Sequence, residues 1–584
     1  MISIEINDEI LDLTPGTSIR FELVSPLFNI NYITAAYTFP FTLPLTPRNK
    51  RILGFPHIIN NKSSLTKKHT VRIKVLDHAF DGILVVNRTG KRDISVSYYS
   101  QEKSFASVIE KKKLGEMSLG GVRHFGATTM DIVNHAKATT TGTIKDYDYV
   151  FFPYQNPDFY GDLNPDFDGI VNKWDFVNNT FYSNATSYFT QPNHYNLSPC
   201  IYAFYLLRQC FEEHGITVKG SIFTDEELMQ LVIYNNYALD KKLSPSDYTN
   251  VYSNDIDLRN HVPEMTIQEF LIEIRKPFFL NFLFSFNKQE VEVVTIRDVL
   301  ASNKYKDWTK KLSAEDLELT QNDDGYIFRF ERDGNDGITP VSDFTKNKII
   351  GNLEIWNTVP FPGHWDDSGE LFELRLHEPT NQYYVRSKVS RFTGNLAELW
   401  KLFSENLAPY KVGDGAEEIN VKFSPWLQIP TVISGDYPSI PTIKNTGYSE
   451  IYNEDEQEKP AFGTRLTFYR GMKTHGEGEY PLASSVNYWK MDFHYPSIFE
   501  SLGNYSLFWS NAAGLFTQWY EKWIEALISH KALRFKLKLS ITDIFNFSFK
   551  DKIRIQENEY LVKRLSFSAS EKGISPVEAE MHRL

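Results

Sequence analysis

The stretch LRFKLKLSI, residues 533–541, indicates the fold of this chain most directly. Every second residue in it is apolar, and the residues between are basic or polar. A period of two sends alternate side chains to opposite faces of a strand, so we expect one face in a core and the other in water. The apolar set is Leu533, Phe535, Leu537, Leu539 and Ile541, and the polar set is Arg534, Lys536, Lys538 and Ser540.

The residues around this strand, 501–584, are predicted to form a helix followed by an antiparallel β-meander. Apolar residues at helical spacing run from Leu515 to Leu527, and short alternating runs begin at Ile553, Leu561 and Val577. Strands with one buried face suit a barrel, and we expect this meander to complete one.

The N-terminal residues show the same alternation of apolar and polar side chains. Apolar residues alternate from Ile2 to Ile6 and from Val71 to Val75, and residues 95–99 close the set. We therefore predict that residues 1–99 form a β-barrel or sandwich. Residues 37–55, which have an unusual composition, form a long insertion between two strands of this barrel or sandwich.

Three regions are predicted between these ends. Residues 100–195 are irregular and loop-rich. Residues 196–310 form an α+β domain, because capping signals at Ser198, Thr224 and Thr266 precede apolar helical faces and Pro277 is expected to end the third helix. Residues 311–500 are β-rich. The predicted fold class is α+β, mostly β, and multi-domain, with barrel-like domains and an inserted helix-containing domain.

Length and charge limit the possible functions. A chain of 584 residues exceeds a single core, which stops growing at about 250–300 residues. The formal net charge of -12 argues against a protein that grips nucleic-acid phosphates, whereas an acidic surface could line a passage through which DNA moves without sticking. The aromatic share of 15% is high, as in strands and interfaces.

Targeting signals and disulfides are not expected. Cys200 and Cys210 lie in one predicted helix, about 15 Å apart, too far to bond each other. The chain starts directly on an alternating strand, so no signal peptide is predicted, and no run of 18 apolar residues suggests a membrane span. We expect synthesis in a reducing cytoplasm.

Reaction machinery is not evident. The sequence contains no P-loop, no dinucleotide-binding glycine pattern and no metalloprotease or hydrolase motif, and its 14 histidines are scattered. We predict no enzyme activity. The alternative is a glycan-binding or glycan-cleaving β-protein, because the many rings could stack on sugars, although a secreted enzyme would need a signal peptide. A third possibility is an unrelated multi-domain scaffold.

One stretch could hold calcium. Asn164, Asp166, Asp168 and Asp175 occupy positions one, three, five and twelve of a twelve-residue loop, with Gly169 at the sharp turn. The loop departs from the calcium-binding pattern in its first ligand and in having Asp where a bidentate Glu is usual. Ordinary turn chemistry explains the same residues. Calcium is thus a hypothesis for this loop, and no other cofactor is predicted.

The segment YTFPFTLPLTPRNKRILGF, residues 37–55, combines three prolines with four aromatic rings and three cations. Prolines disfavour a core strand, and rings disfavour disorder. We predict an extended arm that packs either against a neighbouring subunit or as a strap over its own barrel. Its candidate contact residues are Tyr37, Phe39, Pro40, Phe41, Pro44, Arg48 and Phe55.

The sequence resembles structural proteins of phage tails. The likeness lies in the arm, in SPCIYAFYLLRQCFEEHG (198–215), in KPAFGTRLTFYRGM (459–472) and in the C-terminal run from 539 to 581. These segments resemble baseplate-hub or tail-associated proteins at the tail tip of phages or prophages of Bacteroidetes. None of them is a catalytic signature.

The resemblance implies a virion component assembled in the host cytoplasm. It implies a homo-oligomer, expected to be a trimer, with two barrel-like hub domains per subunit arranged as a ring that closes the tail tube. The implied partners are a distal-tail ring above and fibre or spike proteins below, with DNA passing through during ejection and without specific binding. No catalytic residue carries over.

Overall fold

A computed structural model places most of the chain. It describes residues 2–31, 37–58, 68–100, 105–106, 108–161, 167–183, 195–241, 251–285, 288–316, 325–331, 354–356, 372–377, 382–387, 401–403, 409–414, 417–429, 440–450, 464–475, 478–490, 499–510 and 512–584. The fold is α+β, mostly β and multi-domain, as predicted. Of the helices in these ranges, none combines the length and apolar character needed to cross a membrane.

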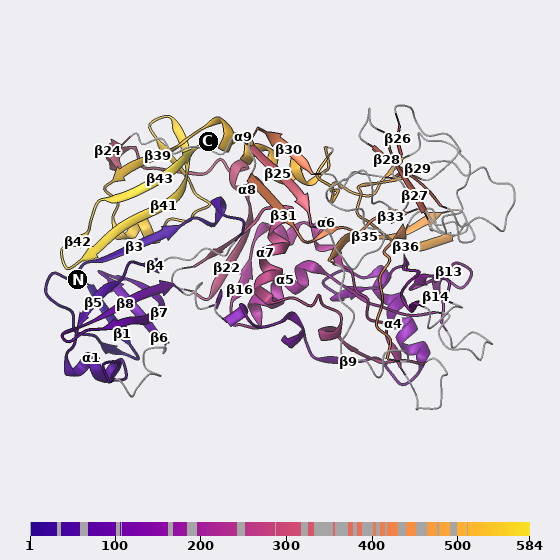
Figure 1. The fold of residues 1–584 in the computed structure, drawn as a ribbon, viewed down its shortest axis with the longest axis horizontal. Coiled ribbons are helices and arrows are strands. Elements are labelled where there is room, and N and C mark those ends of the chain that lie inside the picture. The colour runs from indigo at the N-terminus through magenta and orange to yellow at the C-terminus, as the bar shows by residue number, and fades with distance from the viewer. Residues whose placement is uncertain are drawn as a thin grey trace.

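Strands from both ends of the chain join in one sheet (Figure 1). The described residues give it 15 strands in the order β2-β1-β6-β7-β8-β4-β3-β41-β43-β39-β24, with β5, β23, β40 and β42 attached beside this path. We call these strands together the barrel module. They are β1 (Ile2–Ile6), β2 (Glu9–Ile10), β3 (Ile19–Val24), β4 (Tyr37–Thr38), β5 (Phe41–Pro44), β6 (Lys68–Val75), β7 (His78–Thr89), β8 (Asp93–Ser100), β23 (Tyr305–Asp307), β24 (Leu312–Asp316), β39 (Ala532–Leu537), β40 (Lys552–Ile555), β41 (Asn558–Ser570), β42 (Gly573–Ile574) and β43 (Val577–Arg583).

The C-terminal half of the module is a strongly curled sheet. β41 pairs with β43, β43 with β39 and β39 with β24. A short 3-10 turn, Thr309–Lys311, joins β24 to β23, which runs parallel to β40, and β40 pairs back with β41. Since this turn, and none of the described strand pairings, joins β24 to β23, the sheet is a curled half-barrel whose inward side chains form a core.

The N-terminal half is a curled sheet that shares this core. β3 pairs with β41 from Ile19 opposite Ala569 to Val24 opposite Arg564. The ring of Phe21 stacks between Phe80, at 4.9 Å between centroids, and Phe567, at 5.2 Å. One apolar core therefore spans both halves.

Residues 533–541, which were predicted to form one strand, are a strand only in their first part. β39 ends at Leu537, and Ser540 then begins α10 (Ile541–Phe545). Ser540 Oγ accepts a bond from Asp543 N at 3.2 Å, and the Asp543 carboxylate accepts one from Ser540 N at 2.8 Å, which is a capping box. The predicted strand thus stops early because a capping signal overrides the alternation.

The predicted arm is folded into the chain's own sheet. β4 pairs with β3 and β8, and β5 pairs with β8. Thr46 caps the short helix α1 (Pro47–Ile52), with Pro47 at its first position, where a missing amide hydrogen is tolerated. The buried Asn49 side chain donates to Asp12 O at 3.0 Å and to Pro44 O at 2.8 Å, which fixes α1 to the sheet.

The central part of the chain contains most helices. Three of them, α5, α7 and α8, pack against a mixed three-stranded sheet in which β16 runs parallel to β22 and β22 is antiparallel to β21. These elements are α4 (Thr129–Thr141), α5 (Ala203–Glu212), α6 (Glu226–Met229), α7 (Ile267–Phe278), α8 (Ile296–Ala301), a π-helical turn (Phe516–Tyr520), α9 (Glu521–Ser529), β16 (Thr217–Lys219), β21 (Leu280–Phe284) and β22 (Glu290–Thr295).

Several predicted helix boundaries shift. The Thr266 cap is confirmed, whereas Asp225, not Thr224, caps α6. Pro277 lies inside α7, one residue before its end. Cys200 is in strand β15 (Cys200–Ile201), outside the helix that holds Cys210, because the chain pairs with β10 (Tyr149–Val150) before α5 begins. Both thiols are free and buried.

The remaining strands of the central part are mostly short. A longer strand, β35, pairs with β36, β17 and β32, and its pairing with β17 brings residues 231–233 beside residues 466–468. These strands are β9 (Val122–His124), β11 (Tyr154–Gln155), β12 (Ile170–Val171), β13 (Trp174–Asp175), β14 (Thr180–Phe181), β17 (Leu231–Ile233), β18 (Asp240–Lys241), β19 (Val251–Tyr252), β20 (Asp255–Asp257), β25 (Gly325–Phe330), β26 (Glu354–Trp356), β27 (Phe372–His377), β28 (Gln382–Ser387), β29 (Lys401–Phe403), β30 (Tyr410–Gly413), β31 (Glu417–Val421), β32 (Ser424–Pro425), β33 (Gln428–Ile429), β34 (Ile440–Pro441), β35 (Arg465–His475), β36 (Gly478–Ser484), β37 (Tyr488–Lys490) and β38 (Phe499–Ser501).

Buried asparagines link the loops of this central part. Asn172 donates to Phe152 O at 3.0 Å and to Ser198 O at 2.9 Å, and it accepts a bond from Ser198 N at 2.7 Å. Side chains that bond to backbone groups replace the regular ladder hydrogen bonds that short strands lack. We call these residues the asparagine cluster, and they are Asn156, Asn172, Asn235, Asn236 and Asn445.

Candidate functional site

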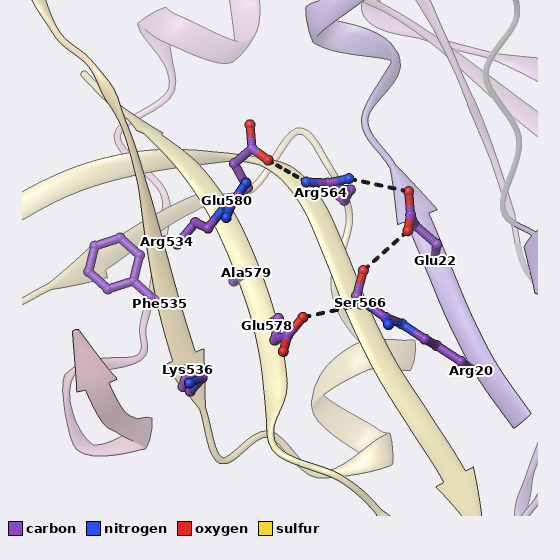
Figure 2. A pocket seen from close by; sticks show the side chains of 10 residues that line it. All are labelled: Arg20, Glu22, Arg534, Phe535, Lys536, Arg564, Ser566, Glu578, Ala579 and Glu580. Carbon is purple, nitrogen blue, oxygen red and sulfur yellow. Dashed lines mark hydrogen bonds and ion pairs between the residues drawn. The ribbon is translucent and has the colours of Figure 1, made fainter. Parts of the chain in front are cut away.

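A strip of charged side chains crosses four adjacent strands of the barrel module, β3, β41, β43 and β39, on the face turned away from the core (Figure 2). It follows from alternation, because the core takes the intervening residues, such as Phe21 and Ala579. The strip borders a cavity of about 670 Å³. We call this row of side chains the charged strip, and its members are Arg20, Glu22, Arg534, Lys536, Arg564, Ser566, Glu578 and Glu580.

Strand register arranges these charges with opposite signs facing. Glu580 of β43 lies opposite both Arg534 of β39 and Arg564 of β41. Glu578 lies opposite Lys536 on one side. Directly opposed residues of opposite charge stabilise antiparallel pairs, typically by about 0.2–1 kcal/mol each. The middle strand is therefore acidic, with cations on both sides.

Glu580 is a buried carboxylate of this arrangement and meets two cations. Its two oxygens meet Lys563 Nζ at 3.0 Å and Arg564 Nη2 at 2.8 Å. A register shift between Val562 and Arg564 marks a bulge, which lets two consecutive cations reach one carboxylate. Burial alone would raise the pKa of Glu580, but the bonds and charges of the two cations hold that pKa below its usual value.

Three further contacts connect β3 to the rest of the strip. Arg564 Nη1 lies 3.7 Å from Glu22 Oε1, and the Ser566 hydroxyl donates to Glu22 Oε2 at 3.4 Å. Arg20 Nη2 lies 3.5 Å from Glu578 Oε2 across the sheet (Figure 2). These ion pairs join the N-terminal and C-terminal halves of the module on its outer face.

The chemistry of the strip suits electrostatic contact better than proton transfer. A general acid that cleaves glycosides needs a raised carboxyl pKa, whereas the pKa of Glu580 is lowered. The Ser566 hydroxyl bonds to a carboxylate and not to an imidazole base. Arginine and carboxylate groups in register are well suited to meeting opposite charges on a protein surface.

The predicted calcium loop is only partly described. Asn164 and Asp166 lie outside the described residues. Asp168 Oδ2 pairs with Lys173 Nζ at 2.5 Å, and Asp175 Oδ1 accepts bonds from two backbone amides of the following turn, at 2.9 and 3.0 Å. The described carboxylates thus serve local turn chemistry, and calcium stays a prediction. Among the described residues, no group of three or more His, Cys, Asp or Glu could hold a metal ion.

The predicted arm residues lie on two sides of the sheet. Phe41 is buried in the core, and Arg48 Nη1 pairs with Asp12 Oδ1 at 3.4 Å. Phe39 and Phe55 are 39% and 43% exposed, which is high for rings of this size. The Arg20 guanidinium lies 4.9 Å from the centroid of the Phe39 ring. The strand pairing shows how the arm packs within its chain, and its role between subunits stays a prediction.

The remaining candidate residues of the arm are one tyrosine and two prolines. Tyr37 belongs to β4, Pro40 is exposed between β4 and β5, and Pro44 ends β5. A proline at the end of a strand removes no ladder bond within it.

Sequence reasoning singled out Arg534 and Lys536 only as the polar partners of an alternating strand. It did not find Glu22, Arg564 or Glu580. Their signal was present as polar residues at every second position of other strands, but the register that brings them together depends on pairing between residues more than 500 positions apart, as in β3 and β41.

Comparison with known proteins adds two structural neighbours. No family model and no curated protein sequence matches the chain. A prophage MuSo2 43 kDa tail protein from Shewanella oneidensis is similar over 100% of this chain and 97% of its own length, with 7% identity and a TM-score of 0.33. A tail protein from Neisseria meningitidis MC58 is similar over 100% and 95%, with 8% identity and a TM-score of 0.32. These likenesses carry no part of the functional argument below.

Proposed function

We propose that this chain is a structural protein of a phage tail, located at the tail tip. In this proposal, copies of the chain, three in number, form a baseplate-hub ring that closes the end of the tail tube. The ring joins a distal-tail ring to fibre or spike proteins and lets DNA pass during ejection. The subunits assemble in the host cytoplasm and carry out no reaction of their own.

The observation that supports this proposal most is the architecture of the barrel module. The sequence resemblance to hub proteins implies two barrel-like domains per subunit, and the described strands form two curled, half-barrel halves of one sheet around one core. A module built from both chain ends is rigid, because separating its halves would open the pairing of β3 with β41. Rigidity of this kind suits a ring that carries mechanical load.

The charged strip supplies a surface for contact between subunits. Its charges alternate in sign, so a neighbouring surface must match them to bind well, which gives specificity and fixes register. Such contacts weaken as salt screens them. The DNA passage is consistent with a net charge of -12, which repels phosphate groups.

The test is the mass of the purified full-length chain in solution, measured for the wild type and for Glu578→Lys. Glu578 is exposed and lies in the strip, so the reversal should weaken association at least tenfold. Glu571→Lys, in the exposed turn between β41 and β42, is the matched control and should leave the mass unchanged. A wild-type protein that stays a monomer at micromolar concentration and hydrolyses a glycan would overturn the proposal in favour of the glycan alternative.

A further inference from the structure

Helix α9 is held in place by few buried side chains. Of its nine residues, only Trp523 and Ile524 are buried. The turn that precedes it, Phe516–Tyr520, is π-helical, a rare conformation that is frequent at functional positions. A helix of this length is not stable alone in water, so the position of α9 depends on what its two buried residues contact.

Trp523 connects α9 to the barrel module. The helix lies beside the C-terminal end of β43 (Figure 1), and the Trp523 ring lies 6.3 Å from the imidazole of His582 on that strand, between centroids. Phe28, in the 3-10 turn Pro26–Phe28, lies 4.9 Å from Trp523 and 6.1 Å from His582. We call Phe28, Trp523 and His582 the three-ring contact.

The imidazole of His582 is enclosed in this contact, because the residue is only 3% exposed. Its Nδ1 lies 2.9 Å from Arg583 O, and a carbonyl oxygen only accepts, so the neutral ring carries its hydrogen on Nδ1. The basic nitrogen is then Nε2, which is buried and has no hydrogen-bond partner within the described residues. A proton added at Nε2 would therefore create a buried charge, which is costly.

The surroundings of His582 favour the neutral ring. Burial lowers the pKa of His582, the carbonyl of Arg583 opposes this, and the charges of His530 and Lys563 lower the pKa further. The carbonyl of His530, at the end of α9, has a smaller opposing effect. The balance is a lowered pKa.

The nearby carboxylates are Glu580 and Glu417. Glu580, two positions before His582 on β43, already pairs with Lys563 at 3.0 Å. Glu417 of β31 lines the same cavity as His582 and Lys563, about 220 Å³ in volume. Exposed Asn31 also borders this cavity, so it opens to the surface and gives water a path to the ring.

We propose that the three-ring contact is a pH-sensitive attachment, in which protonation of His582 releases α9 from the barrel module. The neutral imidazole packs against Trp523 and Phe28, whereas the imidazolium would lie beside Lys563 and lacks the water it needs. Release lets water reach the charged ring. Because α9 leads directly into β39, release would loosen the link between the central part and the charged strip. The inference does not depend on the number of subunits.

The direction of the pH dependence follows from this arrangement. When α9 is released, His582 has its usual pKa of 6.5, and when α9 is attached the pKa is lower. The released state therefore binds more protons below pH 6.5. Attachment is strongest above pH 6.5 and weakens as the pH falls toward the lower value, by at most about tenfold per pH unit for one proton.

The first experiment is hydrogen exchange of the full chain, measured by mass spectrometry between pH 8 and 5 and corrected for the intrinsic pH dependence of exchange. Protection of residues 521–530 should fall by about tenfold between pH 7 and 5.5. Protection of residues 203–212, in α5, should stay constant. Constant protection of 521–530, or an equal loss in 203–212, would overturn the proposal.

Variants assign this loss to one side chain. His582→Phe keeps a ring in the contact but cannot titrate, so protection of 521–530 should be equal at pH 7 and 5.5. His124→Phe is the matched control, because the His124 side chain is 68% exposed, and it should keep the wild-type loss. A loss that persists in His582→Phe, or that disappears in His124→Phe or in His530→Asn, would overturn the assignment to His582.

A further variant tests the same residue without replacing it. Lys563→Gln removes the cation beside His582 and should raise the pKa of the ring, so the loss of protection should begin at higher pH. A loss that begins at the same or at lower pH than in the wild type would contradict the proposal.

Discussion

The barrel module and the asparagine cluster show two ways in which this chain specifies a structure. In the module, apolar side chains at every second position meet in one core, and Phe21 stacks between rings from distant strands. In the cluster, strands of two residues cannot define a face, and amide side chains bond to backbone groups instead. The first method tolerates similar apolar residues, whereas the second depends on particular donors and acceptors.

The largest expected effect tests the packing of the barrel module. Phe21→Ala should lower the free energy of unfolding by about 3–5 kcal/mol, because it leaves a cavity between two stacked rings. Denaturant unfolding of the full chain measures it. Phe39→Ala, between β4 and β5 and 39% exposed, is the control and should cost less than about 1 kcal/mol. Equal losses would show that core packing does not hold the module together.

A comparable loss in the free energy of unfolding is expected when a buried ion pair in the central part is broken. Arg470 has a side chain only 2% exposed, and it pairs with Glu227 at 2.6 Å and donates to Val486 O and Tyr505 O. Arg470→Met should cost about 3–5 kcal/mol, because it leaves the Glu227 carboxylate enclosed without its cation. Thermal unfolding monitored by tryptophan fluorescence measures the change.

The matching change in the barrel module is Arg72→Met. Arg72 pairs with Asp81 at 2.7 Å, but its side chain is 54% exposed, so water screens the pair. We expect a loss of less than about 1 kcal/mol. A larger loss than in Arg470→Met would contradict the role assigned to burial.

The sequence predicts these two regions unequally, for a physical reason. Alternation in residues 533–537 and 71–75 identifies strands and their buried faces, because a period of two is a local property. The Thr266 cap is equally local and was predicted. The partners of Asn172 and the register of β3 with β41 depend on segments far apart in the chain, which no local pattern contains.

The charged strip, too, could be predicted from the sequence only where its pattern is local. The polar alternation of Arg534 and Lys536 was visible, whereas the bulge that brings Lys563 and Arg564 to one carboxylate was not. The arm showed an anomalous composition, but alternation over Phe41 and Leu43 is too short to reveal that β5 joins the sheet.

A smaller loss in the free energy of unfolding is expected for a substitution within the asparagine cluster. Asn235 donates to Ser198 Oγ at 2.7 Å and to Pro199 O at 2.8 Å, and it accepts a bond from Tyr237 N at 2.9 Å. Asn235→Ala should cost about 2–3 kcal/mol, because buried partners lose their bonds. Asn31→Ala, at an exposed position, should cost almost nothing by the same measurement. Similar losses would remove the distinction between the two regions.

The last expected effect is a change in the pH dependence of stability. Asp240 is buried, and burial raises its pKa to about 6 although Tyr160 and Ser449 donate to it. Because this pKa lies above the unfolded value of 3.8, its favourable contribution is full below pH 4 and is lost as the pH rises through 6. Asp240→Asn should therefore gain stability over the wild type between pH 4 and 6, reaching on the order of 2 kcal/mol.

Stability curves of both proteins at pH 4, 5, 6 and 8 measure this difference. A constant difference across the range would show that Asp240 does not titrate in the folded protein.

We propose that surfaces of the barrel module are covered by other copies of the chain. The most direct measurement is an electron-microscopy image of the purified full-length protein at moderate salt. We expect a three-fold ring with a central opening and with the barrel modules in contact. Single particles with the mass of one 67.7 kDa chain would contradict it.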